Sequence, residues 1–137
     1  FIRAMNNKAR QLGMRNSRFY DSTGLSTRNV STARDLAKLI TAAYRQPLIR
    51  QFTQDTNKEM RFSTPAYSLM FNNTNPLVKN PDWDVRLSKT GYTDEAGRCL
   101  LMRAKPDRQE LAIVLLNSVG KRTPIGDANR IRKWLKS

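Results

Sequence analysis

The chain has 137 residues, and 25 Lys plus Arg against 11 Asp plus Glu give it a formal net charge of +14. It contains no histidine, which excludes a Ser-His-Asp triad, a Cys-His pair and the usual zinc sites within these residues. The length suits one domain with its own core, and no apolar run is long enough to predict a transmembrane span. The charge attracts polyanions without selecting among nucleic acid, anionic lipid and an acidic cell-wall polymer.

The first segment, residues 1–14, has the apolar spacing of a helix, and Gly13 stands in its C-terminal capping position. Residues 16–29 are rich in Asn, Ser, Thr and Gly, which predicts a loop. The Asp21 carboxylate and its neighbouring hydroxyls are groups that catalysis uses, but hydrogen bonds to the local backbone are the usual role of such residues in loops. We therefore predict that this segment is structural.

The clearest helix runs over residues 33–44, with a Ser-Thr pair as its N-cap and Pro47 as its stop. From Phe52 the pattern changes to short extended pieces. Two of them, residues 60–62 and 67–71, predict a hairpin because a Ser-Thr-Pro turn separates them.

The most informative stretch begins at Trp83, which with Val85 and Leu87 alternates with polar residues in the period of a half-buried strand. Lys89 continues the parity of Trp83, so its ammonium is expected to leave the buried face where a cleft begins. In such a low dielectric a unit charge at about 4 Å is worth about 4 kcal/mol, against about 1 kcal/mol in water. Gly91 removes a side chain that would keep a ligand off the strand edge. The alternative is a snorkelling lysine before an ordinary glycine turn.

Two further strands, residues 98–104 and 110–118, follow and are joined by a turn at Pro106. The apolar run 111–116 predicts a strand that is covered on both faces, and the single cysteine, Cys99, is predicted to be a small buried hydrophobe. A final helix opens with a Thr-Pro pair and has one apolar stripe. Together these elements predict an α+β fold, an antiparallel sheet of about three strands with helices packed on it.

The tripeptide Lys89-Thr90-Gly91 is one of three signatures of the penicillin-recognising serine acyltransferases, beside Ser-x-x-Lys and Ser-x-Asn. The series of segments around it resembles the C-terminal half of low-molecular-mass penicillin-binding proteins, in the branch of the D-alanyl-D-alanine endopeptidases. The resemblance implies a partial DD-peptidase/β-lactamase-like fold, with residues 1–137 as the C-terminal part of one catalytic domain. In chain order, the segments are Asp21-Ser22-Thr23-Gly24-Leu25-Ser26, Asn29-Val30-Ser31-Thr32-Ala33-Arg34-Asp35-Leu36-Ala37, Asn72-Asn73-Thr74-Asn75 and Tyr92-Thr93-Asp94-Glu95-Ala96-Gly97.

The same resemblance implies that the parent protein is a serine D-alanyl-D-alanine endopeptidase or carboxypeptidase. Such an enzyme hydrolyses peptidoglycan stem peptides through an acyl-enzyme and binds β-lactam antibiotics. No cofactor, no metal and no nucleic acid are among its expected partners. A periplasmic location follows, because the substrate lies outside the inner membrane.

Roles for individual residues also follow from the resemblance. Lys89 is the implied catalytic residue, which helps to conduct a proton to the leaving amine. Thr90 would hydrogen-bond the carboxylate of the ligand, while the backbone after it pairs with the extended peptide and contributes to the oxyanion site. The substrate-binding candidates are Lys89, Thr90, Gly91, Tyr92 and Thr93, with Thr74 and Asn75 at the cleft rim and Arg122, beside Lys121, as a carboxylate-binding cation.

The nucleophile is expected outside these residues. A serine of this family needs a lysine one helical turn later. The sole match, Ser118-Val119-Gly120-Lys121, ends an apolar strand, contains a glycine and follows the Lys-Thr-Gly stretch. We therefore expect the serine upstream of Phe1 and predict that this fragment alone is inactive. With part of the sheet missing, it should expose apolar surface and a free edge, and so associate with itself or with its own N-terminal half.

Two other hypotheses stay open. The first is a non-catalytic basic module that binds an acidic polymer or nucleic acid through the +14 charge. Steeply salt-dependent DNA binding would be its signature, but no aromatic RNA-binding pattern or helix-turn-helix spacing accompanies the charge. The second is a β-lactamase or esterase on the same scaffold, which the rate of β-lactam turnover would distinguish from a peptidase.

Overall fold

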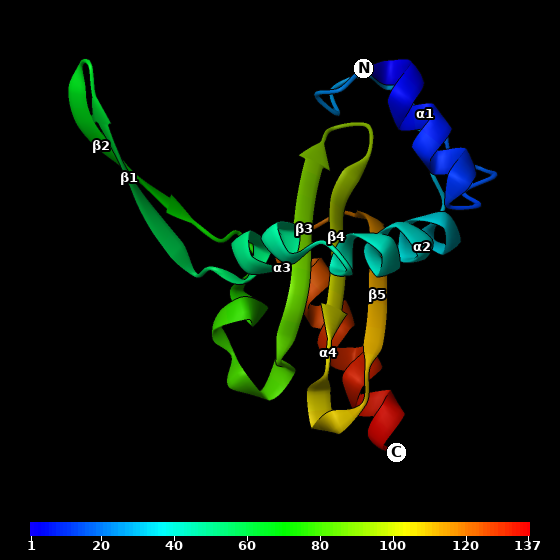
Figure 1. The fold of residues 1–137 in the computed structure, drawn as a ribbon. Helices are drawn as coiled ribbons and strands as arrows, with labels where there is room; N and C mark the ends of the chain where they lie inside the picture. The colour runs from blue at the N-terminus through cyan, green and yellow to red at the C-terminus, as the bar shows by residue number, and fades with distance from the viewer.

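The structure, a computed structural model, describes residues 1–137 (Figure 1). No helix in it is both long enough and apolar enough to cross a membrane. Three short 3-10 turns, Pro76–Lys79, Pro81–Trp83 and Pro106–Arg108, connect the strands. The regular elements are α1 (Ile2–Gln11), α2 (Ala33–Tyr44), α3 (Pro47–Gln54), β1 (Asn57–Ser63), β2 (Ala66–Asn72), β3 (Val85–Thr93), β4 (Gly97–Ala104), β5 (Leu111–Ser118) and α4 (Thr123–Lys136).

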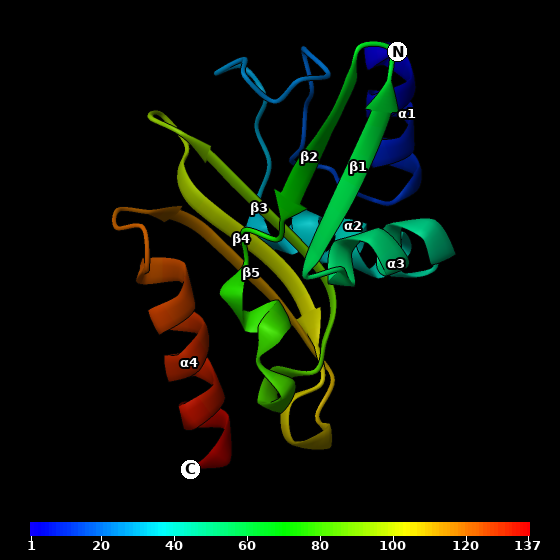
Figure 2. The ribbon, with the colours of Figure 1, turned by 90° about the vertical axis from the view of Figure 1, so that its left-hand side faces the viewer.

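The centre of the molecule is an antiparallel sheet in the order β3-β4-β5. Helix α2 crosses one face of the sheet and α4 covers the other (Figures 1 and 2). Trp83, Leu100, Met102 and Ala128 belong to the buried core on the α4 side. The predicted α+β class and the three-stranded meander are confirmed.

Strand β5 is covered less completely than its apolar run predicts. Ile113 is buried, but Ala112 is exposed and Leu116 keeps 39% of its surface exposed. The reason is that β5 pairs only with β4 and forms one edge of the sheet. The expectation of cover on both faces is therefore wrong for part of the strand.

Helix α1 ends at the predicted glycine. Gly13 adopts a left-handed conformation with φ of 72°. Its N–H donates to the Arg10 carbonyl at 2.9 Å, and the Met14 N–H donates to the Ala9 carbonyl at 2.9 Å. This pair of bonds is a Schellman motif, which satisfies carbonyls at the end of the helix.

The loop after α1 is built on Asp21. Its carboxylate accepts hydrogen bonds from the N–H groups of Thr23 and Ser26 and from the side chains of Thr23 and Asn29. The Thr23 hydroxyl, followed by the Asn29 amide and the backbone, lowers the pKa of Asp21 to about 2. The prediction of a structural, turn-forming role is confirmed.

Helix α2 has its predicted span, and the Thr32 hydroxyl caps it by accepting from the Asp35 N–H at 3.2 Å. Asp35 itself is buried, with 1% of its surface exposed. Its carboxylate accepts from the Asn16 N–H at 2.8 Å, the Ser17 hydroxyl at 2.9 Å and the Lys38 ammonium at 3.1 Å. Burial acts to raise the pKa of Asp35, but these bonds outweigh burial and lower it. Asp35 thus fastens the N-terminal loop to α2.

A third helix follows α2, where the sequence pattern did not indicate one. Pro47 is the first residue of α3 and not only a stop, because its fixed φ and missing N–H suit the first turn of a helix. The extended structure predicted from Phe52 is therefore wrong up to the start of β1. Helix α3 lies against β3, where the Gln54 amide donates to the Arg86 carbonyl at 2.7 Å.

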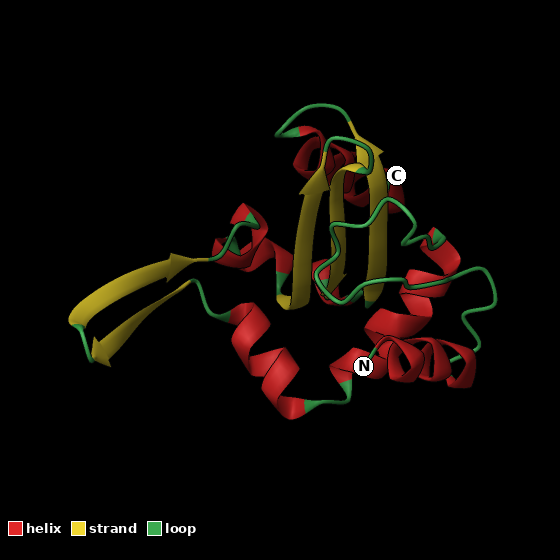
Figure 3. Ribbon diagram, turned by 90° about the horizontal axis from the view of Figure 1, so that it is seen from above, coloured by secondary structure: helices red, strands yellow, loops and turns green.

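Strands β1 and β2 form the predicted hairpin, which projects from the rest of the molecule (Figures 1 and 3). Every residue of both strands is exposed. The cross-strand register places the apolar side chains mostly on one face, where the Phe62 and Tyr67 rings stack at 4.5 Å. This exposed face belongs to the hairpin, whereas exposed apolar surface was predicted where part of the sheet is missing, and self-association stays a prediction. The apolar hairpin face consists of Met60, Phe62, Tyr67, Leu69 and Phe71.

Strand β3 begins later than predicted and is interrupted by a bulge. Trp83 lies in a 3-10 turn, Asp84 is left-handed with φ of 42°, and the strand starts at Val85. A register shift between Val85 and Leu87 moves Leu87 and Lys89 to the other face of the sheet. The inference that Lys89 continues the parity of Trp83 is therefore wrong. Lys89 instead follows the buried Leu87 on the face that α2 and α3 contact.

Candidate active-site cleft

The candidate site lies along β3, which pairs with β4 on one side and has no partner on the other. The free N–H and C=O groups of such an edge can pair with an extended peptide. A methyl group on Gly91 would meet no atom within 4 Å. No packing within the chain therefore requires a glycine at position 91, and its effect is to keep the strand edge open.

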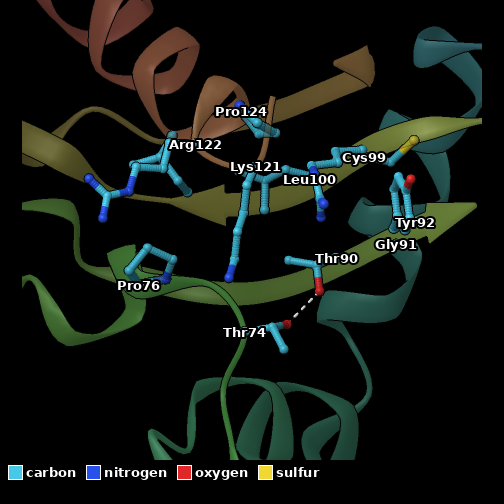
Figure 4. Close-up of a pocket in the computed structure, with 12 residues that line it drawn as sticks. Thr74, Pro76, Thr90, Gly91, Tyr92, Cys99, Leu100, Lys121, Arg122 and Pro124 are labelled. Atoms are coloured by element: carbon cyan, nitrogen blue, oxygen red, sulfur yellow. Dashed lines mark hydrogen bonds between the residues drawn. The ribbon is translucent and has the colours of Figure 1, made fainter. Parts of the chain in front are cut away.

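A pocket of about 510 Å³ opens beside this edge, between β3, the loop after the hairpin and the start of α4 (Figure 4). It brings together residues that are far apart in the sequence. Five predicted site residues line it, namely Thr74, Thr90, Gly91, Tyr92 and Arg122, together with Pro76, Arg98, Cys99, Leu100, Lys121, Pro124 and Ile125.

Two hydroxyls meet at one side of the pocket. The Oγ1 atoms of Thr74 and Thr90 are 2.5 Å apart (Figure 4). Thr90 lies opposite Leu100 in the register of the sheet, and so its side chain is on the α4 side. The hydrogen bond holds the Thr90 hydroxyl in the pocket, where it can also contact the carboxylate of a ligand.

Asn75 does not lie at the rim of the cleft, where the sequence pattern placed it. Its side chain is completely buried, donates to the Ser88 hydroxyl at 2.8 Å and accepts from the Leu77 N–H at 3.1 Å. The rim prediction is wrong because both ends of the amide find partners inside the protein. Asn75 instead pins the loop to β3 and so positions Thr74.

Three cations surround the pocket, and no acidic residue lines it. Lys121 extends across the pocket toward Thr74, whereas the guanidinium of Arg122 points away from Thr90 (Figure 4). The third cation is Arg98, on β4. Their combined positive charge favours an anionic ligand group. Of the two basic residues after the last strand, Lys121 is therefore the one directed at the hydroxyl pair.

Arg98 is a pocket residue that the sequence reasoning missed. It lies opposite Tyr92 in the β3–β4 register, and its guanidinium carbon is 4.3 Å from the centre of the Tyr92 ring. The Tyr92 hydroxyl donates to Asp94 at 2.5 Å, and this bond raises the pKa of Tyr92. Thr93 and Gly97 face each other at the turn between β3 and β4, and this pairing places Arg98 opposite Tyr92. Counting back from the turn along both strands could therefore have identified Arg98 from the sequence.

Lys89 and Thr93 do not line the pocket. Lys89 is exposed on the opposite face of the sheet, where its ammonium donates to the Thr90 carbonyl. The Thr93 hydroxyl accepts from the Ala96 N–H at 3.1 Å within the turn. A ligand along the free edge of β3 would therefore have Lys89 on one side and the Thr90 pocket on the other.

Neither Ser118 nor Cys99 is arranged as a nucleophile. Ser118 is buried at the end of β5, and Lys121 follows it through a turn that is not helical. Within this turn the Gly120 N–H donates to the Thr123 hydroxyl at 3.1 Å. Cys99 is only half-buried, contrary to the predicted small core residue, and its thiol faces the Ala96 carbonyl at 3.6 Å. No cluster of three or more metal-binding side chains is present.

The antiparallel sheet with helices on both faces places the chain in the fold class of the DD-peptidases, as two solved structures show. The crystal structure of a Streptomyces DD-transpeptidase matches with a TM-score of 0.87 at 26% identity, over 97% of this chain and 52% of that one. A penicillin-binding protein of Listeria monocytogenes in its cefotaxime-bound form matches in fold, with a TM-score of 0.80 at 24% identity, over 96% of this chain and 53% of that one.

Residues 1–120 match the model of the family described as D-alanyl-D-alanine carboxypeptidase. The chain therefore belongs to this family. The D-alanyl-D-alanine endopeptidases of Pseudomonas aeruginosa and Escherichia coli are each 47% identical over 137 residues, which is 100% of this chain. The chain spans 44% of the length of each of these two relatives.

Proposed function

We propose that these residues form the Lys-Thr-Gly side of the active site of a serine D-alanyl-D-alanine endopeptidase. The whole protein would hydrolyse peptide cross-bridges of peptidoglycan through an acyl-enzyme and would bind β-lactams. The observation that carries the proposal is the Thr90 hydroxyl, held by Thr74 in a basic pocket beside a free strand edge. A D-alanyl peptide offers an extended backbone to the edge and a carboxylate to the pocket, and a β-lactam offers a carboxylate as well.

In this reaction a serine outside residues 1–137 attacks the carbonyl carbon of a D-alanine, the C–N bond to the next residue breaks, and the amine leaves with the proton that the serine hydroxyl loses. Water then hydrolyses the acyl-enzyme. Lys89 stands beside the edge on the face opposite the pocket. We assign its ammonium to stabilising negative charge and to conducting the proton to the leaving amine, a step that typically contributes about 10²- to 10⁴-fold.

The pocket serves as the carboxylate subsite in this proposal. The Thr90 hydroxyl donates to the ligand, while Lys121 and Arg98 supply positive charge in a lining without acidic residues. Arg122, which the sequence suggested as the carboxylate-binding cation, lines the pocket but directs its guanidinium away from Thr90. The backbone of residues 91–93 pairs with the extended peptide, for which Gly91 leaves room.

A location follows from the substrate. Because peptidoglycan lies outside the inner membrane, we place the whole protein in the periplasm, acting on the cell wall. Residues 1–137 are then the C-terminal part of a single catalytic domain, and the nucleophile belongs to the other part of that domain. The coverage of 44% of the endopeptidase relatives supports this arrangement.

The test is intact-mass analysis of the whole protein after exposure to benzylpenicillin, followed by peptide mapping. We expect one covalent adduct on a serine outside residues 1–137, and acylation at least about a hundredfold slower in Lys89→Ala. Lys79→Ala, at an exposed position outside the cleft, is the control and should react like the wild type. An adduct on Ser118 overturns the assignment. No adduct, together with tight and salt-dependent DNA binding, would favour the basic module instead.

A further inference from the structure

A second pocket lies between helix α1 and the segment that follows it. It encloses about 500 Å³ and shares no lining residue with the cleft. Met14 is the single apolar residue of its lining, and the remaining side chains are polar or charged. We call it the arginine pocket, because its walls carry Arg3, Arg10, Arg15 and Arg18.

The framework of the arginine pocket is fixed by hydrogen bonds. The Asn6 side chain on α1 donates to the Phe19 carbonyl at 2.7 Å and accepts from the Phe19 N–H at 2.9 Å. On the other side, the Ser17 hydroxyl donates to the buried Asp35 carboxylate at 2.9 Å. Both walls are therefore held in place before any ligand arrives, which reduces the entropy lost on binding.

No carboxylate of the chain neutralises the charge of the arginine pocket, although Arg10 donates to the Asn7 side chain and the Arg18 guanidinium carbon lies 5.4 Å from the centre of the Tyr20 ring. None of its four arginines takes part in an ion pair. The neighbouring Asp35 carboxylate is already used by Asn16, Ser17 and Lys38. Like charges that share one hollow repel each other, so an anion that enters relieves this repulsion. Other arginines of the chain also lack a carboxylate partner, but these four line one hollow.

The lining indicates the chemistry of the ligand. Guanidinium groups bind carboxylates and phosphates through pairs of parallel hydrogen bonds. Four of them around a hollow of about 500 Å³ suit a ligand with several anionic groups better than a single small ion. The apolar lining residue, Met14, is only 2% exposed, so the pocket offers nothing to a lipid chain. These features favour a hydrophilic polyanion over a membrane surface.

We propose that the arginine pocket is a second binding site for peptidoglycan, which holds the carboxylates of its peptides away from the cleft. Holding the polymer at one site raises the effective concentration of its cross-bridges at the other. That the polyanion is peptidoglycan rests on the proposed function of the cleft. That the pocket binds polyanions rests on its four arginines alone.

The test compares binding of the whole protein to purified insoluble peptidoglycan, by co-sedimentation over a series of NaCl concentrations. In the variant Arg3→Gln, Arg10→Gln, Arg15→Gln, Arg18→Gln we expect at least about a tenfold loss of affinity and a flatter dependence on salt, because fewer ionic contacts form. The rate of acylation by benzylpenicillin should not change, since none of these arginines lines the cleft. If this variant does not fold, the double variant Arg10→Gln, Arg18→Gln takes its place, with an intermediate loss expected.

The control variant removes the same number of charges from exposed positions that line neither pocket and have no carboxylate partner, namely Arg34→Gln, Lys79→Gln, Arg108→Gln, Lys133→Gln. We expect it to lose less than about twofold in affinity. An equal loss in both variants would show that net charge alone binds the polymer and would overturn the proposal.

Two further outcomes separate the remaining explanations. If the arginine variant keeps its affinity for peptidoglycan but loses affinity for phosphatidylglycerol vesicles, the assigned ligand is wrong. If arginine-dependent peptidoglycan binding is found in a protein that benzylpenicillin does not acylate, the second binding site stands and the proposed function of the cleft fails.

Discussion

The hydroxyl oxygens of Thr74 and Thr90 lie 2.5 Å apart, so one hydrogen bond joins the loop after the hairpin to the Lys-Thr-Gly strand. Directly behind it, the buried amide of Asn75 donates to the Ser88 hydroxyl of the same strand at 2.8 Å. Successive residues of the loop thus hold the same face of β3. Through these two hydrogen bonds the uncharged residues Thr74 and Asn75 position the Thr90 hydroxyl in the pocket.

The first prediction concerns this hydroxyl pair. Thr74→Val keeps the shape of the side chain but leaves the Thr90 hydroxyl without its partner. We expect acylation of the whole protein by benzylpenicillin to slow by about three- to tenfold, the equivalent of about 1 kcal/mol for one hydrogen bond. Thr74→Ser retains a hydroxyl and should react like the wild type. Equal losses in both variants, measured by stopped-flow fluorescence, would contradict the role of the hydrogen bond.

A second prediction compares two glycines of the β3–β4 hairpin. Gly97 is left-handed with φ of 63°, and a methyl group there would lie 2.8 Å from Asn117 Oδ1. Gly97→Ala should therefore destabilise the protein by about 2 kcal/mol. Gly91→Ala meets no atom within 4 Å, so it should leave the thermal midpoint unchanged and slow acylation by crowding the strand edge. Thermal unfolding and acylation of both variants give the comparison, and equal destabilisation would mean that the edge at Gly91 is covered.

The regular elements of the fold were largely predictable, and the failures have local causes. Period-two alternation and capping residues identified the three-stranded meander, the hairpin, α1 and α2. The alternating pattern of the sequence did not predict the bulge in β3. One extra residue in a strand turns every later side chain to the opposite face of the sheet. Lys89 therefore changed faces. Pro47 was predicted only to end α2. Proline can end one helix and also begin the next, and here it is the first residue of α3.

The site was predictable only as far as its motif. The Lys-Thr-Gly motif, which lies within β3, and the loop before it supplied Thr90 and Thr74, both of which line the pocket. Asn75 was predicted at the cleft rim and is buried instead. An asparagine in an exposed turn and an asparagine that anchors a loop inside the protein look alike in a sequence. Lys121 and Arg98 depended on tertiary structure. Lys121 reaches the pocket because the start of α4 and strand β3 line the same hollow, and Arg98 reaches it because of the register between β3 and β4.

A third prediction follows from the burial of Asn75. In Asn75→Ala the Ser88 hydroxyl loses its donor and the Leu77 N–H loses its acceptor, both inside the protein. Leaving such groups unpaired costs about 1–3 kcal/mol, which urea unfolding should detect as a lower midpoint. Combining it with Ser88→Ala tests the pair, since the double variant should lose less than the sum of the single ones. Strict additivity would show that the two side chains act independently.

The fourth prediction is a dependence of stability on pH. Hydrogen bonds in the folded protein lower the pKa of Asp21 from 3.8 to about 2. A lowered pKa means that Asp21 stabilises the fold at pH values above about 4, and that this contribution is lost as the pH falls toward 2. Asp21→Asn should therefore lower the thermal midpoint at pH 6 and narrow its difference from the wild type at pH 2. Parallel curves for the two proteins from pH 6 to pH 2 would contradict this role.

The last prediction concerns the apolar hairpin face, which no other part of the chain covers. Exposed apolar surface of this kind promotes association, because contact removes it from water. Leu69, in the middle of this face, is 46% exposed. Leu69→Asp would place a charge in any contact that the face makes, at a high cost in desolvation. We expect sedimentation velocity to show concentration-dependent association of the wild-type protein and a clear loss of it in Leu69→Asp.

The neighbouring residue provides the control for this experiment. Met70 is also apolar and 58% exposed, but it lies on the opposite face of the same strand. Met70→Asp changes the charge of the hairpin by the same amount and should leave association unchanged. If both variants reduce association equally, the charge of the hairpin is responsible and not its apolar face. If the wild type stays monomeric at all concentrations, the expectation that this exposed surface drives self-association is wrong.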